Sequence, residues 1–577
     1  MRIPRPTKLW TRTVALAAAG TLAAGALAAC GADSAGSAST GSSDTSAAEI
    51  AATDNSGRSA QDVLAANLSS EETAALADQT WDTADEVAVA LDGDTATASG
   101  DGVTVDGSTV TITQPGTYRV SGTLDDGQVV VDASADGVVR LVLDGAEITS
   151  STGAAIDVRD ADQVSVVLAD GSTNRLEDAA EYADTTSDNA ANAALYSTAD
   201  LAVSGTGALE VVGNANDGIT GKDGLVLAGG DISVTAADDA IRGKDYLVVS
   251  GGTIDVQAGG DGLKSDADDD ATAGYVALTG GDVTVEAGDD GAQAFTDIAI
   301  TDGSLTIEKS VEGLEAATIA ISGGDVDITS SDDGLNATVK EAEDDTATDD
   351  SATGTDDQAA PDQGAAPEAP ADGQAPQGGG GGGGGMDEVQ DGASLTVTGG
   401  TLHVDAEGDG LDSNGVAVIS GGDVVIEGPT NGGNGALDSA GGLTVSGGTL
   451  LAVGSSGMAE APGTDSSQGW VALTADSTLE AGTEVAVVDA DGTQVATLTL
   501  TKPAQSVVYS GPEITSGDTY TLTADGTEVG TAAAGEAPAG GMGGGPGGGG
   551  QPGQDAPDGQ GPQGAQGEQS SSGTATS

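Results

Sequence analysis

Apolar and polar residues alternate in short runs along much of the chain, and these runs recur on both sides of a Gly-Gly pair. The leading glycines of the pairs are Gly229, Gly251, Gly280, Gly323, Gly399, Gly421 and Gly447. Their clearest spacing is 22 residues, and the other intervals differ from it by single residues or insertions. Around the first pair, the alternating apolar residues are Leu225, Leu227, Ile232 and Val234. Such alternation predicts short strands with one buried face.

A third apolar residue follows each Asp-Gly turn or its variant, as at Ile219, Ile241 and Leu263. Each repeat therefore holds three short strands separated by turns. Glycine recurs too often for helix, and no apolar stripe of helical period is present. Self-similarity at this period indicates stacked repeats. The predicted fold is all-β: a right-handed parallel β-helix, or solenoid, of about 22 residues per coil with a small C-terminal β cap and disordered arms.

Composition changes along the chain set the predicted domain boundaries. The strands are expected from Val103 onward, Ala60–Leu76 is compatible with helix, and Asn189–Tyr196 is expected to be a loop. The predicted segments are a lipoprotein signal peptide (1–29), a partly disordered tether (30–95), the β-helix (96–468) with an acidic, Pro- and Gly-rich disordered insertion (341–393), a β cap (469–534) and a disordered Gly/Pro-rich tail (535–577).

The first residues have the features of an export signal. A basic start is followed by an apolar stretch that ends in Leu27-Ala28-Ala29-Cys30. This ending resembles a bacterial lipobox, and the resemblance implies that Cys30 is lipidated and anchors an extracellular protein to the cell membrane. The alternative is a plain secretory leader with a chance cysteine. Because Cys30 is the only cysteine, no intramolecular disulfide is possible.

The charge balance narrows the range of partners. The chain has 93 acidic and 16 basic residues, a formal net charge of −77. Such an excess argues against nucleic acid and against anionic membrane surfaces, so contact with the membrane is expected only through the lipid anchor. Aromatic residues make up 2% of the chain, which leaves little material for a platform on which sugars could stack.

Acidic residues recur at the Asp-Gly turns, and stacking would align them in a column. Like charges about 5 Å apart cost about 0.8 kcal/mol per pair in water, so a bound cation would explain their repetition. Ca²⁺ binds carboxylate and carbonyl oxygens, which makes it the expected cofactor. The alternative is that Asp-Gly only forms good turns. The candidate metal ligands are Asp217, Asp238, Asp239, Asp261, Asp266, Asp268, Asp289 and Asp290.

Basic residues cluster near the same turn. Arg242, Lys244 and Lys264, with Lys222 beside them, are candidates for contact with the carboxylates of an acidic glycan. They could equally neutralise the neighbouring aspartates. Together with calcium, one of them could serve as the base in β-elimination of a polyuronate. His403, the single histidine, is expected to point into solvent.

Several longer motifs carry a resemblance to a known family. They are Thr117–Gly122, Arg140–Gly145, Asn216–Ile219, Asp239–Asp245, Gly260–Asp266 and Gly454–Pro462. With these motifs the chain resembles the carbohydrate-binding domain-containing family of secreted parallel β-helix proteins, which is related in fold to polysaccharide lyases. The resemblance covers roughly 100–530, and the 341–393 insertion departs from it. It implies binding of plant or microbial cell-wall glycans, including acidic ones, with calcium held on the surface.

Three functions are compatible with the sequence. The leading hypothesis is a monomeric, lipid-anchored surface protein that binds polysaccharide with the help of calcium. The second is a calcium-dependent polysaccharide lyase of the pectate type, which would release unsaturated uronides. The third is a structural wall protein without a ligand, which the few aromatic residues and the long arms would also allow.

Overall fold

The computed structural model describes residues 57–78, 80–187, 189–340 and 389–537. Of the two compact units of the chain, Met1–Ala48 and Glu49–Ser577, all these residues belong to the second. The predictions for the signal peptide, for Cys30, for most of the insertion and for most of the tail lie outside the described residues. Within the described part, no helix has the length and apolar character needed to span a bilayer.

Nearly all regular structure in the described residues is β-strand. The three short helices all precede the first strand: α1 (Ala60–Leu64), α2 (Glu71–Ala75) and the 3₁₀ helix η1 (Thr83–Asp85). The strands form sheets of 20, 13 and 4 strands. The predicted all-β class is therefore confirmed.

The 20-stranded sheet contains the longer strands. They are β1 (Val87–Gly93), β2 (Thr95–Ala98), β5 (Gly116–Leu124), β7 (Val138–Thr149), β9 (Gln163–Leu168), β10 (Thr173–Glu177), β12 (Asp200–Gly205), β13 (Ala208–Gly213), β15 (Gly224–Ala236), β17 (Tyr246–Gln257), β19 (Tyr275–Glu286), β21 (Asp297–Lys309), β23 (Thr318–Ile321), β24 (Asp325–Ser330), β26 (Ser394–Ala406), β28 (Val416–Glu427), β30 (Leu443–Val445), β31 (Thr449–Gly454), β32 (Trp470–Leu479) and β35 (Ala504–Ser510).

The 13-stranded sheet is made mostly of three-residue strands. They are β3 (Val103–Asp106), β4 (Thr109–Ile112), β6 (Gln128–Asp132), β8 (Ile156–Asp160), β11 (Ala193–Ser197), β14 (Asp217–Gly221), β16 (Ile241–Gly243), β18 (Leu263–Ser265), β20 (Ala292–Ala294), β22 (Leu314–Ala316), β25 (Leu335–Ala337), β27 (Leu411–Ser413) and β29 (Leu437–Ser439). They lie in this sheet in chain order. β11 covers much of the expected Asn189–Tyr196 loop, because its residues pair with β8 and β14 on either side.

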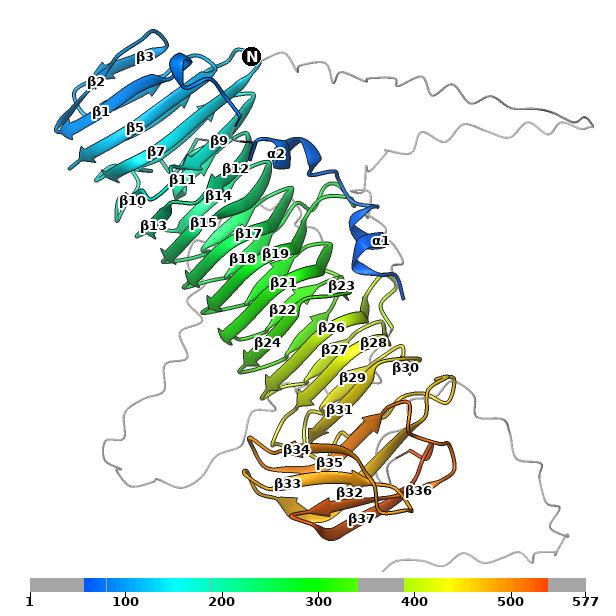
Figure 1. Cartoon of the computed structure of the whole chain (residues 1–577). Coiled ribbons are helices and arrows are strands. Elements are labelled where there is room, and N and C mark those ends of the chain that lie inside the picture. The colour runs from blue at the N-terminus through cyan, green and yellow to red at the C-terminus, as the bar shows by residue number, and fades with distance from the viewer. Residues whose placement is uncertain (1–56, 79, 188, 341–388, 538–577) are drawn as a thin grey trace, which may run out of the picture. The chain divides into compact units, whose positions relative to one another are not determined.

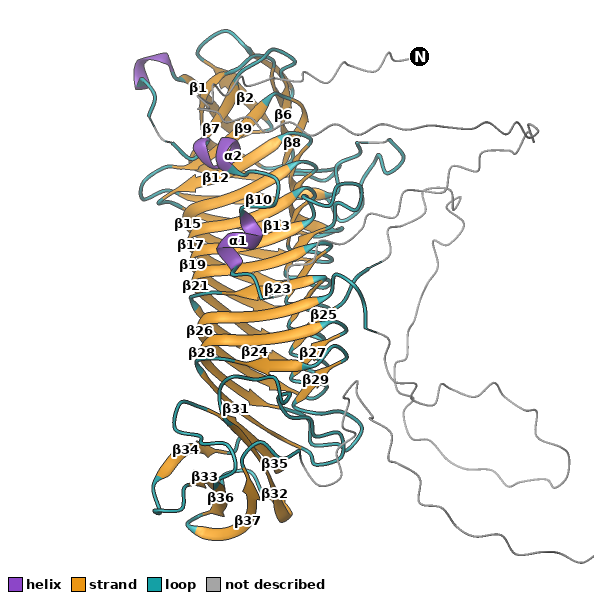
Figure 2. Ribbon diagram, turned by 90° about the vertical axis from the view of Figure 1, so that its right-hand side faces the viewer, coloured by secondary structure: helices purple, strands orange, loops and turns teal. Residues whose placement is uncertain are grey.

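Each repeat unit contributes strands to both large sheets. β15 pairs parallel with β17 on either side of a register shift between Leu227 and Asp231. Gly230 lies in this bend with a φ of 105°, a conformation that favours glycine. The chain then turns through Asp238 and Asp239, forms β16 in the 13-stranded sheet and returns to the 20-stranded sheet as β17. Figures 1 and 2 show the strands of successive units lying side by side.

The inward positions of successive units form one continuous apolar core. Ile219 pairs with Ile241, and Ile241 with Leu263; each is at most 2% exposed. The same register continues beyond the insertion, where Ile319 pairs with Leu395. The predicted alternation and the predicted resumption of the repeat are therefore confirmed. Antiparallel pairs occur only toward the two ends of the described strands, as between β1 and β2 or between β32 and β35.

Residues 57–86 are not the tether that the sequence suggested, and the strands begin at β1, before the expected boundary. Ser59 caps α1 by accepting a hydrogen bond from the backbone of Asp62, and Val63 of α1 is buried against Ala299 and Ala320. Further on, Leu76 packs on the outward side chains of β15, β17 and β19. Figure 2 shows α1 and α2 lying over strands of the 20-stranded sheet, and the strands beneath α1 are β21 and β23. The segment folds because these strands have apolar residues on their outward side as well, which it removes from water.

This covering segment is tied down by a buried hydrogen bond between Thr73 Oγ1 and Tyr246 Oη, 2.7 Å long. Replacing Tyr246 with phenylalanine removes it and should cost about 1 kcal/mol locally. We expect faster amide hydrogen exchange across 60–76. Tyr118→Phe is the matched control, because the Tyr118 hydroxyl donates to Gln114 O near the N-terminal end of the repeats and not to the covering segment. Equal exchange in Tyr246→Phe and wild type would show that the hydrogen bond does not hold the segment.

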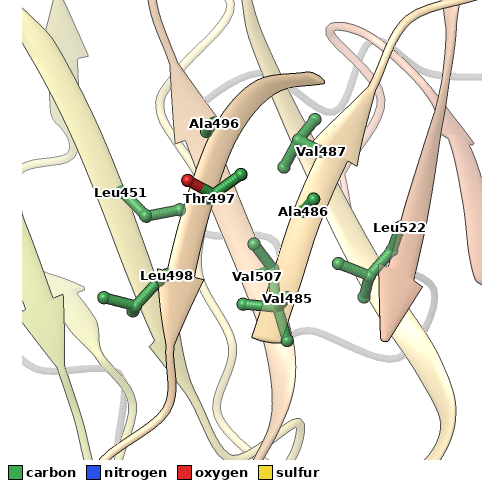
Figure 3. Close-up of a pocket in the computed structure, with 9 residues that line it drawn as sticks. All are labelled: Leu451, Val485, Ala486, Val487, Ala496, Thr497, Leu498, Val507 and Leu522. Atoms are coloured by element: carbon green, nitrogen blue, oxygen red, sulfur yellow. The ribbon is translucent and has the colours of Figure 1, made fainter. Parts of the chain in front are cut away.

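The last strands form a unit with its own core. β33 (Glu484–Val488), β34 (Gln494–Thr499), β36 (Thr519–Ala524) and β37 (Thr527–Ala533) make the four-stranded sheet. Figure 3 shows side chains of β33–β36 facing Leu451 of β31, with Thr497 the one polar residue among the nine. The space between them has no room for a water molecule, so it is packed core. Leu450 instead joins the core of the repeats, so β31 connects the two cores.

Candidate functional site

The outward side chains of the 13-stranded sheet form a continuous column of hydrogen-bonding groups. In each three-residue strand the first and last side chains point inward and the middle one outward, as the pleat requires. Parallel pairing in register then places the middle residues next to one another. We call this set the polar column: Asp157, Tyr196, Thr220, Arg242, Lys264, Gln293, Glu315, Asn336, Asp412 and Asp438.

A second set of acidic residues stands three positions earlier in each unit, at the turn before the strand. These turn acids are Asp217, Asp239, Asp261, Asp290, Glu312, Asp333 and Asp409. Several of them cap the backbone of the next unit. Asp239 Oδ1 accepts from the backbone N–H of Asp261 at 2.9 Å, and Asp261 Oδ1 from that of Asp290 at 3.0 Å. Such hydrogen bonds stabilise buried carboxylates and account for the repetition of the turn without a cation.

Two of the predicted glycan-binding bases act as counter-ions within the chain. Lys264 Nζ lies 3.0 Å from Asp239 Oδ2 and 2.8 Å from Asp261 Oδ2, and both carboxylates are buried. Arg242 forms a two-pronged ion pair with Asp266, with Nε 3.1 Å from Oδ1. The structure therefore favours the neutralising role that the sequence left open. It also uses three of the predicted metal ligands in ion pairs.

The other predicted site residues are distributed along the turns. Asp217 is 1% exposed and accepts hydrogen bonds from Asn192 and Thr220; burial raises its pKa to about 7. Asp238 and Asp289 are exposed beside the turn acids, and Asp268 is half-buried in the turn after β18. Lys244 and Lys222 lie at turns leaving the 13-stranded sheet, with burial lowering the pKa of Lys222.

One group of acids in the described residues converges closely enough to share a metal ion. Oxygen atoms of Asp290, Glu312 and Glu315 lie within 4.8 Å of one another. Burial and then Asp261 raise the pKa of Asp290 to about 8, and burial and then Glu315 raise that of Glu312 to about 7. The sequence analysis missed Glu315, although its position three residues after Glu312 follows the spacing from Asp239 to Arg242 and from Asp261 to Lys264.

Neutral and basic groups surround these three acids. Gln293 Nε2 donates to Asp290 at 3.1 Å and to Glu315 at 3.3 Å. Asn336 Nδ2 donates to Glu312 at 3.0 Å, while its buried Oδ1 has no hydrogen-bond partner among the described residues. Lys340 forms an ion pair with Glu315. The group thus offers at least one oxygen from each of the three carboxylates, the Oδ1 of Asn336 and one nearby positive charge.

The last units of the column are acidic, and among the residues that the structure describes no base pairs with their turn acids as Lys264 does. Burial, then Asp333 and Asp438, raises the pKa of Asp412 to about 8. Burial and then repulsion from neighbouring acids likewise raise the pKa of Glu460 to about 7, and burial is the largest cause of the rise to about 7 at Asp409. Unlike the middle of the polar column, this end resists further negative charge.

The expectation of a solvated His403 is wrong. Its ring is half-buried between Asp327, 3.3 Å from Nδ1, and Glu427, 3.6 Å from Nε2. The contact with Glu427 is the main cause that raises the pKa of His403 to about 8. Glu427 also accepts from Thr501, so this contact joins β28 to the C-terminal unit. The contact lies outside the 13-stranded sheet, and we assign it a structural role.

Comparison with known proteins gives a family match over part of the chain. Residues 106–355 match the model of the carbohydrate-binding domain-containing proteins. A solved structure, the polysaccharide lyase-like protein from C. thermocellum in a gadolinium derivative, is 35% identical over 42% of this chain and 94% of its own, with a TM-score of 0.36. A carbohydrate-binding domain-containing protein from Acetivibrio thermocellus is 43% identical over 126 residues, which are 22% of this chain and 44% of that relative's length. The matched part contains the polar column from Asp157 to Asn336.

Proposed function

We propose that this protein is a cell-surface lipoprotein that binds polysaccharide along the polar column. The observation that carries the proposal is the unbroken register of seven partly exposed, outward polar side chains, from Arg242 to Asp438, on adjacent parallel strands. The match of residues 106–355 to the carbohydrate-binding domain-containing proteins supports the same partner.

The geometry of the column suits a linear polymer. Neighbouring strands lie about 4.8 Å apart, so a chain that runs across the strands meets a new polar side chain at each step. A linear glycan advances by a similar length per sugar. Hydrogen bonds from the partly exposed Gln293 and Asn336 would therefore recur with the sugar repeat, whereas a globular partner would not need such regularity.

We further propose that the strands wind as a right-handed parallel β-helix of about 22 residues per coil, as the Gly-Gly spacing suggests. Parallel pairing of each strand with its counterpart in the next unit supports this winding. Parallel strands of one sheet are joined by right-handed connections in about 98% of cases, which supports the hand. A regular coil would keep the side chains of the polar column in line.

Calcium belongs to the proposal at Asp290, Glu312 and Glu315. The oxygens of these acids fit a hard cation that takes six to eight oxygen ligands, and Asn336 Oδ1 adds another donor beside them. A bound divalent ion would offset the effects of burial and of repulsion, which raise the two pKa values. It would also bridge this acidic protein to an acidic glycan, which its charge of −77 otherwise repels.

The anchor and the location rest on the leader alone. Lipidation at Cys30 would place the protein outside the cell, held at the membrane by its N-terminus, where cell-wall glycans are accessible. We propose a monomer, because each unit already pairs with its neighbours and binding needs no second copy. Labelling with a radioactive fatty acid, compared between wild type and Cys30→Ser, tests the anchor: equal labelling of both would overturn it.

The lyase alternative would need a base on the polar column. Burial lowers the pKa of Lys264, but the charges of Asp261 and Asp239 raise it by more, so the amine stays protonated. Arg242 is likewise held protonated by Asp266 against the effect of burial. Neither group can accept a proton readily near neutral pH. The geometry therefore favours binding over eliminative cleavage at these residues.

The proposed function predicts calcium-dependent retention of acidic polysaccharide. In affinity electrophoresis, polygalacturonate with millimolar CaCl₂ should retard the protein, and EGTA should abolish the retardation. Glu312→Gln combined with Glu315→Gln should weaken Ca²⁺ binding about tenfold or more in calorimetry. Glu286→Gln with Glu308→Gln is the matched control, because both acids are exposed on other strands. Retention that survives EGTA would refute the bridging role of calcium, and no retention of any polysaccharide would refute the function itself.

A further inference from the structure

A cavity of about 450 Å³ lies at the N-terminal end of the polar column. Its floor comes from β6 and β8, and its wall from the described residues of the connection between β10 and β11, 178–187 and 189–192. Among the lining residues are Gln128, Thr152, Asp157, Arg159, Tyr182 and Asp184. Asp157 belongs both to the cavity and to the polar column, so the two are continuous. The volume lies within the range of about 300–1,000 Å³ typical of small-molecule sites.

The wall of this cavity is held in place by hydrogen bonds. Tyr182 Oη donates to Asp178 at 2.7 Å, and Asp178 also accepts from the backbone of Asn214 at 2.5 Å. The backbone N–H groups of Ala179 and Ala183 donate to Gly153 O and Thr152 O, both at 3.1 Å. The connection is therefore fixed to the loop between β7 and β8, and the cavity is formed before a ligand arrives. Preformed sites lose less entropy on binding.

The charges of the cavity select against acidic ligands. Arg159 is its only lining base, and its Nε already donates to the buried carboxylate of Asp157 at 2.6 Å. Asp184 adds a second negative charge, which Ser187 and Thr186 hold by hydrogen bonds. The lining thus has a formal charge of about −1, with Asp178 behind the wall. A uronate would meet net repulsion here.

The remaining lining groups suit a hydroxyl-rich neutral molecule. Thr152, Gln128 and the unbonded N–H groups of Arg159 supply donors and acceptors, and Tyr182 offers an aromatic ring to the apolar side of a sugar. Beside them, Tyr196 is 0% exposed, and its hydroxyl has no hydrogen-bond partner among the described residues. It packs against Ala154, Ala191 and Tyr182, all of which line the cavity. A buried hydroxyl without a partner is costly, and Tyr196 lies directly behind these lining residues.

We infer that this cavity binds one or two residues of a neutral saccharide, at the end of the polar column. The inference rests on the proposed function and adds a ligand class to it: neutral sugars in the cavity, in contrast to acidic polymer bridged by calcium farther along the column. Arg159 and Asp157 together orient hydroxyl groups, and Tyr182 covers one face of the sugar.

Calorimetry with neutral tetrasaccharides of the glucan, xylan and mannan types, and with trigalacturonate plus CaCl₂, tests the inference. At least one neutral sugar should bind, and Arg159→Gln should weaken it about tenfold or more. Arg175→Gln is the matched control, because Arg175 pairs with Glu177 two residues away but does not line the cavity. In Gly153→Val, binding should be lost, because a Cβ there already lies 3.1 Å from Gln128 Nε2 and 3.8 Å from Tyr182 Cδ1.

The outcomes separate the cavity from the wider function. If neutral sugars bind equally to wild type, Arg159→Gln and a folded Gly153→Val, the cavity is not the binding site. If wild type binds polygalacturonate but no neutral sugar, the cavity proposal is also wrong. Either result would leave the proposed function unaffected. Tighter binding of trigalacturonate that depends on Arg159 would overturn the neutral class. Wild type that binds no saccharide of any kind would overturn both proposals. If circular dichroism shows that Gly153→Val does not fold, the affinity of Arg159→Gln for the neutral sugar, compared with that of Arg175→Gln, decides whether the cavity is the site.

Discussion

Replacing Lys264 with methionine is expected to lower the free energy of unfolding by about 3–5 kcal/mol near pH 7, because it leaves two buried carboxylates without their shared positive charge. Asp239 and Asp261 have side chains that are 8% and 2% exposed, and each lies within 3.0 Å of Lys264 Nζ. Neither can turn toward water, since both also accept a backbone N–H from the next unit. Chemical denaturation of the wild type and the variant measures the loss.

A triple variant tests the cause of that loss. Adding Asp239→Asn and Asp261→Asn to Lys264→Met keeps the Oδ1 acceptors for the backbone but removes both charges, so most of the stability should return. Lys309→Met, at an exposed lysine of β21, should change stability by less than about 0.5 kcal/mol. A folded triple variant that still binds polysaccharide would identify Lys264 as a counter-ion. Unchanged stability of Lys264→Met would instead leave this lysine available for a glycan.

The repeat could be predicted from the sequence because it depends on local alternation. Inward residues such as Ile241 and Leu263 recur at fixed distances from their turns, and parallel stacking follows once every unit has the same pattern. The Asp-Gly turns could be recognised in the sequence as well. The ion pairs that neutralise them could not be predicted, because the partner of Asp239 is Lys264 of the next unit. Only the register of the 13-stranded sheet brings these two residues together.

The covering segment could have been found from a signal that the alternation obscured. In Leu225-Val226-Leu227 the middle residue should face water if only one side of the strand is buried, yet it is apolar, as are Val248 and Ala277 at the equivalent positions. A continuous apolar run is typical of strands covered on both faces. The sequence lacks an equally clear signal for the cavity, which depends on how the connection between β10 and β11 folds back on the loop between β7 and β8.

The two halves of the polar column differ in how they balance charge. Arg242 and Lys264 neutralise the middle units within the chain, whereas the later units bring Asp333, Asp409 and Asp412 together without such a base. Most of the predicted calcium ligands, from Asp217 to Asp268, lie in the middle units, where lysine and arginine already act, and only Asp290 of that set joins the converging acids. The physical need for a cation, or for protons, is greater in the units from Asp290 onward.

Acidification from pH 8.5 to pH 5.5 is expected to stabilise this protein, on the order of 5 °C in Tm. Burial raises the pKa values of Asp412 and Asp290 to about 8 and those of Glu312 and Asp409 to about 7. In the unfolded chain these groups titrate near pH 4. Between pH 4 and 8 the folded state therefore holds more protons than the unfolded state, and stability falls as pH rises. His403, with a pKa of about 8, adds to the same trend.

Asp412→Asn separates this effect from a general response to pH. The amide resembles the protonated acid, so the variant should be more stable than wild type at pH 8.5 and should show a smaller change in Tm down to pH 5.5. Asp255→Asn, at an exposed acid of β17, should leave the trend unchanged. CaCl₂ should raise the Tm more at pH 8.5 than at pH 5.5, because it competes with protons for ionised carboxylates. If the Tm instead rises with pH over this range, the expectation is wrong. These acids would then be ionised in the folded protein and stabilised by positive charges.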